Sequence, residues 1–271
     1  MKNRLELDIL PQPDDTTCGP TCLHAVYRYY ADDIELSRVI EQVRRLDHGG
    51  TYAVYLGLHA LRRGYRVRLF TYDLQVFDPT WFRISREDMI ERLRARRAAK
   101  AGTPLSITLD ACLEFLDAGG EVEFEDLNSR LIRTFLKRGV PILTGLSSTY
   151  LYQCMREYGE KMDDDDIRGD PTGHFVVLCG YDKEDRTVLV ADPMHPNPAF
   201  QGLQYVVEMD RVVCAILLGI LTHDAEMLII ERDDSSLPSP IAAGAQSPLL
   251  FDLPLPTFPP SPIDSPPPPM P

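Results

Sequence analysis

Apolar residues in the first half of the chain recur at intervals of three and four, the spacing that places them on one face of an α-helix. The first such series runs from Gly19 to Tyr30, with Pro20 in the first turn, where a missing N–H is tolerated. Similar series predict further helices at 36–43, 51–63, 86–100 and 125–137. Between them, residues 65–72 (YRVRLFTY) alternate between polar and apolar and predict a half-exposed strand.

Beyond Pro141 the pattern changes to short segments that are rich in branched residues and separated by turn-forming residues. These segments predict six strands: VPILTGL, GHFVVLCGYD, RTVLVAD, QYVVEM, VVCAILLGI and EMLIIE. Successive strands with short connections favour a mostly antiparallel sheet. Helices followed by strands indicate an α+β fold, with an N-terminal helical lobe.

The composition divides the chain after residue 232. Of its 271 residues, 44% are hydrophobic and 25% are charged, as in a folded protein. Residues 233–271, however, hold 13 of the 23 prolines and no basic residue. We therefore predict one domain over 1–232 and a disordered, proline-rich acidic tail over 233–271. The tail is a candidate ligand for a partner that recognises extended proline segments.

Charge and hydropathy argue against several classes of protein. With 28 basic and 41 acidic side chains the formal net charge is −13, which argues against a nucleic-acid partner. The first ten residues, MKNRLELDIL, lack the apolar core of a secretory signal, and the longest apolar run, 212–221, is too short to cross a bilayer. We expect a cytoplasmic protein that does not bind membranes. Six cysteines are too few for a disulfide scaffold in a chain of this length.

The densest candidate chemistry lies in LPQPDDTTCGPTCL, at residues 10–23. Cys18 comes just before the predicted helix, where unpaired amides and the helix dipole favour a thiolate. Gln12 precedes it by six residues and offers a neutral amide donor for a developing oxyanion, with the backbone N–H of Cys18 as a second donor. The alternative interpretation is a surface glutamine and a small buried cysteine.

His174 and Asp192 are the predicted partners of Cys18. His174 opens one predicted strand and Asp192 ends the next, and the turn YDKED between them favours antiparallel pairing. The start of the first strand then lies beside the end of the second, so we expect the two side chains to be neighbours. An imidazole held by a carboxylate is the usual partner of a nucleophilic thiolate. Taken singly, either residue is more often a turn former.

Three blocks in this order, at 12–23, 174–181 and 188–193, resemble the bacteriocin-processing cysteine peptidases that cut after double-glycine leaders, a papain-like family. The resemblance implies a papain-like fold, with Cys18 as nucleophile, Gln12 in the oxyanion hole, and His174 and Asp192 on the sheet. Members of that family that are fused to exporters continue into a membrane domain, which we do not expect here, and His174 comes 156 positions after Cys18, a long interval for that family. The chain therefore resembles stand-alone, soluble relatives.

We expect a cysteine peptidase or amidase that hydrolyses a peptide or small amide through a thioester and needs no cofactor. One alternative is acyl transfer to an amine, as in the phytochelatin synthases, which are similar in fold and triad. The other is a catalytically silent peptide-binding module.

Several other residues have simpler expected roles. Cys22 is expected to pack in the core, His195 to lie on a rim loop, and the scattered cysteines not to bind metal. The long connection 147–173 carries the acidic run 163–166, which is either a solvated loop tip or a lid that attracts a cationic substrate. The arginines at 92–97 are expected to pair with the acidic surface.

Overall fold

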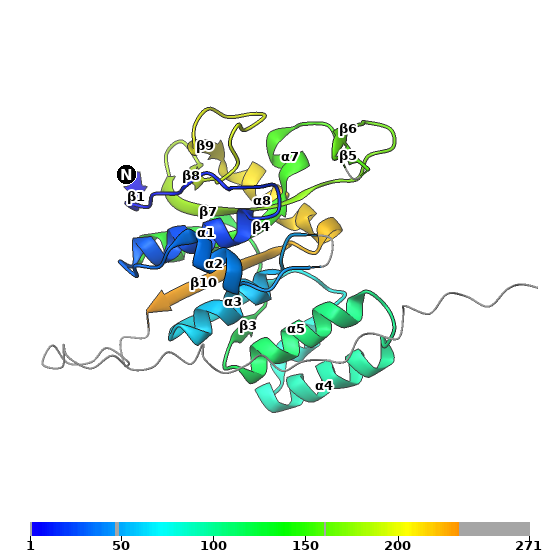
Figure 1. Cartoon of the computed structure of the whole chain (residues 1–271). Coiled ribbons are helices and arrows are strands. Elements are labelled where there is room, and N and C mark those ends of the chain that lie inside the picture. The colour runs from blue at the N-terminus through cyan, green and yellow to red at the C-terminus, as the bar shows by residue number, and fades with distance from the viewer. Residues whose placement is uncertain (1, 47–48, 160, 233–271) are drawn as a thin grey trace, which may run out of the picture. The chain divides into compact units, whose positions relative to one another are not determined.

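The computed structural model describes residues 2–46, 49–159 and 161–232, and its centre is one eight-stranded sheet (Figure 1). The strand order is β3-β2-β10-β4-β7-β8-β9, and the short β1 pairs with β7. The strands are β1 (Lys2–Arg4), β2 (Tyr65–Thr71), β3 (Glu121–Glu123), β4 (Ile142–Ser147), β7 (Gly173–Asp182), β8 (Thr187–Ala191), β9 (Gln204–Glu208) and β10 (Glu226–Arg232). A separate hairpin consists of β5 (Glu157–Tyr158) and β6 (Asp163–Asp164). The tail predicted over 233–271 lies outside the described residues.

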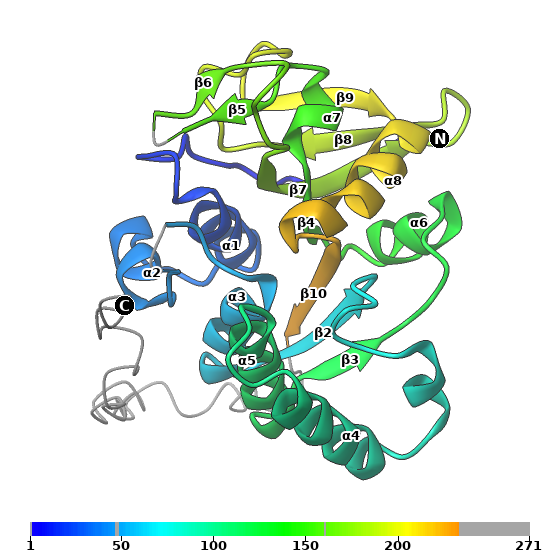
Figure 2. The same ribbon diagram turned by 90° about the vertical axis from the view of Figure 1, so that its right-hand side faces the viewer.

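Helices cover both faces of the sheet, which confirms the α+β prediction. On one face α1 (Cys18–Tyr29) packs against β7, and α3 (Ala53–Arg62) packs against β2 and β10. On the other face lie α6 (Ser129–Lys137) and α8 (Met209–Leu218) (Figure 2). The remaining helices are α2 (Leu36–Gln42), α4 (Arg86–Ala99), α5 (Leu105–Asp117), α7 (Ser148–Tyr152) and the 3₁₀ turns η1 (Pro79–Arg83) and η2 (Gly219–Thr222). Apolar side chains of the helices and of the sheet are thereby removed from water.

The register of β7 determines which loops meet. It pairs antiparallel with β4 on one side and with β8 on the other. His174 is opposite Leu146 of β4, and Val177 is opposite Ala191, the last residue of β8. The start of β7 and the residue after β8 therefore lie at the same end of the sheet.

The strand prediction for VVCAILLGI is wrong, because this segment forms most of α8 and the beginning of η2. Met209, Val212, Ala215 and Ile216 are buried at helical spacing, whereas Leu217 and Leu218 are 43% and 36% exposed. A helix buries one face of this run against β4, and the β-branched residues alone do not reveal that face.

Other predicted elements are present with shifted bounds, and some elements were missed. The helix predicted at 125–137 begins at Ser129, because the Asn128 side chain accepts hydrogen bonds from the amides of Arg130 and Leu131 at 2.9 and 3.1 Å. The sequence pattern did not predict α5, α7, β1, β3 or the β5–β6 hairpin. It also missed the parallel pairing of β2 with β3.

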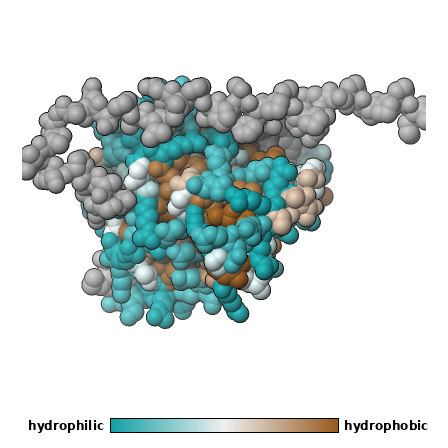
Figure 3. Space-filling view, turned by 90° about the horizontal axis from the view of Figure 1, so that it is seen from below, coloured by the Kyte–Doolittle hydropathy of each residue, from teal (hydrophilic) through white to brown (hydrophobic). Residues whose placement is uncertain are grey.

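The face that carries α4 and α5 is mainly hydrophilic, with apolar side chains in separate patches (Figure 3). Arg97 of α4 pairs with Asp110 of α5 at 2.8 Å, and Arg94 pairs with Asp117 at 3.4 Å. These arginines thus take part in ion pairs with neighbouring carboxylates, as expected from the sequence.

Candidate active site

Cys18 is the first residue of α1, one position earlier than the helix start that the sequence predicts, and its side chain is half-buried. A turn fixes this start: Asp14 accepts hydrogen bonds from the Thr16 amide at 2.9 Å and, through its carbonyl, from the Thr17 hydroxyl at 2.9 Å. Unpaired amides in the first turn favour negative charge near the sulfur.

Gly19 allows this end of α1 to approach the sheet. A β-carbon at position 19 would lie 2.8 Å from the Thr51 side chain and 3.2 Å from the Phe175 ring. Phe175 follows His174 in β7. The glycine therefore brings the helix start close to the strand that carries the imidazole.

His174 and Asp192 are neighbours, which confirms the prediction from strand pairing. Nε2 of His174 lies 2.8 Å from Oδ1 of Asp192, and the two residues are 3% and 0% exposed. Cys18 lies close enough to this imidazole to raise the pKa of His174. The structure thus brings Cys18 close to the His174–Asp192 pair.

Electrostatics at this site favour a charged imidazole. Burial alone would lower the pKa of His174, but Asp192 and Cys18 outweigh it and raise that pKa to about 10. Burial would likewise raise the pKa of Asp192, but the imidazole and hydrogen bonds from His174, Tyr205 and Tyr152 hold it below its usual value. The pair is therefore ionised around neutral pH.

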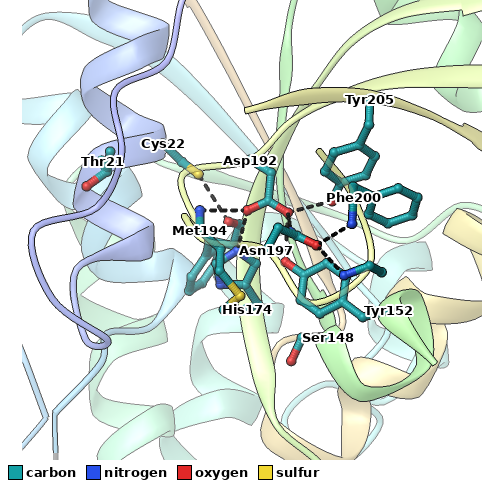
Figure 4. A network of polar contacts seen from close by, with 12 residues as sticks. Thr21, Cys22, Ser148, Tyr152, His174, Asp192, Met194, Asn197, Phe200 and Tyr205 are labelled. Carbon is teal, nitrogen blue, oxygen red and sulfur yellow. Dashed lines mark hydrogen bonds and ion pairs between the residues drawn. The ribbon is translucent and has the colours of Figure 1, made fainter. Parts of the chain in front are cut away.

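Four further groups hold the Asp192 carboxylate in place (Figure 4). Oδ2 accepts hydrogen bonds from the hydroxyls of Tyr152 at 2.7 Å and Tyr205 at 2.5 Å, and from the Asn197 amide at 3.2 Å. Oδ1 accepts the backbone N–H of Met194 at 2.9 Å. With both oxygens fixed, the carboxylate can orient the imidazole without rotating.

Tyr152, Tyr205 and Asn197 were not identified from the sequence. Tyr152 lies in α7, inside the long connection that was singled out, and Tyr205 lies in a correctly predicted strand. No spacing pattern links either tyrosine to Asp192, so the sequence offered no signal for this contact.

Gln12 lies in the loop that leads into α1. Its backbone N–H donates to the carbonyl of Pro193 at 2.8 Å, so this loop runs beside the residue that follows Asp192. The side chain is half-buried, and its Oε1 is buried without a hydrogen-bond partner among the described residues. The structure thus brings all four residues predicted for the site to one end of β7 and β8.

The structure also describes the other residues considered in the sequence analysis, namely Cys22, His195 and part of the acidic run. Cys22 is fully buried and donates its S–H to the Phe175 carbonyl at 3.2 Å, as expected for a core residue, and His195 is exposed. In the acidic run, Asp163 and Asp164 are exposed in the β5–β6 hairpin. Within the described residues, no group of three or more His, Cys, Asp or Glu could hold a metal ion, and no helix there is long and apolar enough to span a membrane.

Residues 123–206 match the model of the Peptidase_C39 like family, a segment that includes His174 and Asp192 but not Cys18. No curated protein matches the chain. The chain thus resembles the bacteriocin-processing cysteine peptidases, as its motifs indicate.

Three solved structures align over most of the chain. One, described as a double glycine motif protease from an AMS/PCAT transporter in complex with the leader peptide, is 14% identical over 85% of this chain and 94% of that chain (TM-score 0.42). The peptidase domain of Streptococcus ComA is 13% identical over 84% of this chain and 99% of that chain (TM-score 0.39). Xylellain, a cysteine protease from Xylella fastidiosa, is 14% identical over 85% of this chain and 85% of that chain (TM-score 0.40).

Proposed function

We propose that this protein is a cysteine peptidase or amidase that cleaves a peptide or small amide through a thioester on Cys18. The observation that carries the proposal is the buried His174–Asp192 pair, 2.8 Å apart, with Cys18 close to its imidazole at the start of α1. A thiol, an imidazole and a fixed carboxylate in this order are the groups that nucleophilic acyl transfer requires. The match to the Peptidase_C39 like family supports the same reaction class.

In the first half of the reaction, the Cys18 sulfur attacks the amide carbon while the imidazolium of His174 holds the proton that the thiol gave up. When the C–N bond breaks, His174 transfers this proton to the departing amine and a thioester remains. In the second half, His174 takes a proton from water, the hydroxide attacks the thioester, and Cys18 leaves as the thiolate. Asp192 stays ionised throughout and holds the imidazole in one orientation.

The tetrahedral intermediates carry negative charge on the former carbonyl oxygen. The side-chain amide of Gln12 and the backbone N–H of Cys18 are the proposed donors to this oxyanion. The contact between Gln12 and Pro193 supports this role, because it holds the Gln12 loop beside the end of β8.

Replacement of Gln12 by alanine is expected to lower kcat roughly 10²- to 10³-fold, the usual loss on removal of one oxyanion donor. Steady-state hydrolysis of a peptide that the wild type cleaves measures the effect. Gln204→Ala is a control, because that glutamine donates to the Leu7 carbonyl at 2.6 Å and has no place in the proposed reaction. An unchanged kcat in Gln12→Ala removes Gln12 from the mechanism.

Iodoacetamide is expected to alkylate Cys18 faster than Cys214 at pH 6, because the imidazolium beside Cys18 stabilises a thiolate. Cys214 is an exposed cysteine of α8 and serves as the internal control, since it is the more accessible of the two. Mass spectrometry of peptides from the modified protein gives both rates. Faster alkylation of Cys214 would argue against a thiolate at Cys18.

A further inference from the structure

Two tyrosine hydroxyls reach the Asp192 carboxylate from elements that lie far apart in the sequence. Tyr152 is the last residue of α7, and Tyr205 lies in β9. Both hydroxyls donate to Oδ2, at 2.7 and 2.5 Å, whereas the imidazole of His174 lies against Oδ1. The two tyrosines are buried, with 6% and 7% exposure. No step of the proposed reaction yet uses them.

The surrounding structure fixes both tyrosine rings. Tyr205 pairs with Val190 of β8, two positions before Asp192, so its side chain points to the face that carries the carboxylate. The Phe200 ring stacks on Tyr205, with ring centres 3.8 Å apart, and meets Tyr152 edge-on at 6.3 Å (Figure 4). The two hydroxyls are thereby held facing Oδ2.

Both hydroxyls keep their protons. Burial raises the pKa of Tyr152 and of Tyr205 well above the ordinary value, and the negative charge of Asp192 raises it further. An ionised carboxylate only accepts hydrogen bonds, so both bonds run from the tyrosines to Asp192.

The donors are distributed unequally over the two carboxylate oxygens. Oδ2 accepts from Tyr152, Tyr205 and the Asn197 amide, and Oδ1 faces the His174 imidazole and the backbone N–H of residue 194. Hydrogen bonds to an ionised acceptor are about twice as strong as neutral ones. Donors on Oδ2 help most when no positive charge faces Oδ1, which is the state after His174 has given its proton away.

Other charged groups around His174 act in the opposite direction. Asp192 and Cys18 favour the imidazolium. Asp224 lies against the residue that precedes His174, and its charge favours the imidazolium too. Cys22 lies near Asp192, but burial raises the pKa of its thiol, which is therefore neutral. An imidazolium that binds its proton too tightly is a poor general acid.

We propose that Tyr152 and Tyr205 are positioning residues that draw the charge of Asp192 toward Oδ2 and so make it easier for His174 to give its proton to the departing amine. The inference rests on the proposed function, because it concerns the proton transfer that accompanies cleavage of the C–N bond. The bonds that form and break are those of that reaction, and both tyrosines keep their protons throughout.

Tyr152→Phe and Tyr205→Phe test the inference, because each removes one hydroxyl and keeps the ring. We expect the pKa of His174 to rise by about half a pH unit or more in each variant. An NMR titration of the histidine side chains, assigned with His174→Gln, measures this pKa without any substrate. The alkaline limb of kcat/KM should move upward with it, and kcat should fall roughly 3- to 30-fold.

A ring-fluorinated tyrosine, introduced at position 205 by codon suppression, tests the opposite direction. Fluorine withdraws charge from the ring, so the hydroxyl stays in place and becomes a stronger donor. We expect the pKa of His174 to fall below that of the wild type. This comparison stands even if neither phenylalanine variant folds, and an unchanged or raised pKa overturns the inference.

Tyr65→Phe is the matched control. Tyr65 is also buried and donates to a carboxylate, that of Asp32, at 3.0 Å, but it has no place in the proposed reaction. Its loss should leave both the pKa of His174 and the pH profile as in the wild type. The same shift in Tyr65→Phe, or no shift in Tyr152→Phe and Tyr205→Phe, overturns the inference.

The proposed function fails in a different way. If the wild type hydrolyses no amide and Cys18 is alkylated no faster than Cys214, the proposed function is wrong and this inference fails with it, whatever the pKa of His174. If the wild type hydrolyses amides but the pKa of His174 is the same in both phenylalanine variants, only the role of the two tyrosines is wrong.

Discussion

Replacement of Cys18 by alanine is expected to lower amide hydrolysis at least about 10⁴-fold, because it removes the sulfur that is proposed to form the acyl-enzyme. The fold should persist. The substitution removes one half-buried sulfur, whereas the buried residues of α1 that pack against β7, such as Cys22 and Leu23, are unchanged. Hydrolysis of a peptide library by purified protein measures the loss, and thermal unfolding followed by circular dichroism checks the fold.

Cys214→Ala is the matched control for this experiment, since it removes an exposed thiol of α8. Its turnover should equal that of the wild type. If Cys18→Ala retains hydrolysis while Cys214→Ala also behaves normally, Cys18 is not the nucleophile. The inactive Cys18→Ala protein also serves to identify substrates, because an uncut peptide should accumulate in cells that carry it.

Replacement of Asp192 by asparagine is expected to lower kcat about 10³- to 10⁴-fold. Asparagine fills the same space but carries no charge, so the buried imidazole loses the main group that raises its pKa. His174 then becomes neutral near pH 7 and no longer stabilises a thiolate at Cys18. The hydroxyls of Tyr152 and Tyr205 also lose their anionic acceptor. A profile of kcat between pH 5 and 10 measures both the loss of kcat and the shift in the pKa of the His174 imidazole.

The pairing of His174 with Asp192 makes the stability of the protein depend on pH in a defined direction. The pKa of folded His174 is raised to about 10 from an ordinary value of 6.5. Its contribution to the free energy of unfolding is therefore fully present below about pH 6.5 and is lost as the pH rises through 10. The difference in Tm between the wild type and Asp192→Asn should narrow from pH 7 to pH 10.

Asp210→Asn controls for loss of a carboxylate as such, because Asp210 forms an exposed ion pair with Arg186 at 2.8 Å. Exposed pairs contribute little to stability, so kcat and the pH dependence of Tm should stay as in the wild type. A wild-type kcat in Asp192→Asn would show that His174 does not need this carboxylate.

The parts of the candidate site that the sequence predicts correctly depend on local rules. Cys18 precedes an amphipathic repeat with a proline in its first turn, and this pattern is sufficient to place it at the start of a helix. His174 and Asp192 border two strands joined by a short turn, and antiparallel pairing then makes them neighbours. Each inference needs only the segment itself and its nearest neighbour in the chain.

Periodicity misassigned the segment VVCAILLGI because branched residues occur both in strands and in buried helix faces. The alternation between buried and exposed residues in α8 is set by what lies across from it, namely β4. The strand order is equally non-local, since β10 is inserted between β2 and β4, which precede it by many residues.

By itself the sequence determined the α+β class, the helix that begins at Cys18 and the pairing of His174 with Asp192. Only the tertiary structure decided which side chains surround them: Tyr152 and Tyr205 on Asp192, and Asp224 against Gly173. The reason is physical. Hydrogen bonding and hydrophobic periodicity act within one element, whereas contacts between distant elements depend on how whole faces pack, and no short pattern of residues records that packing.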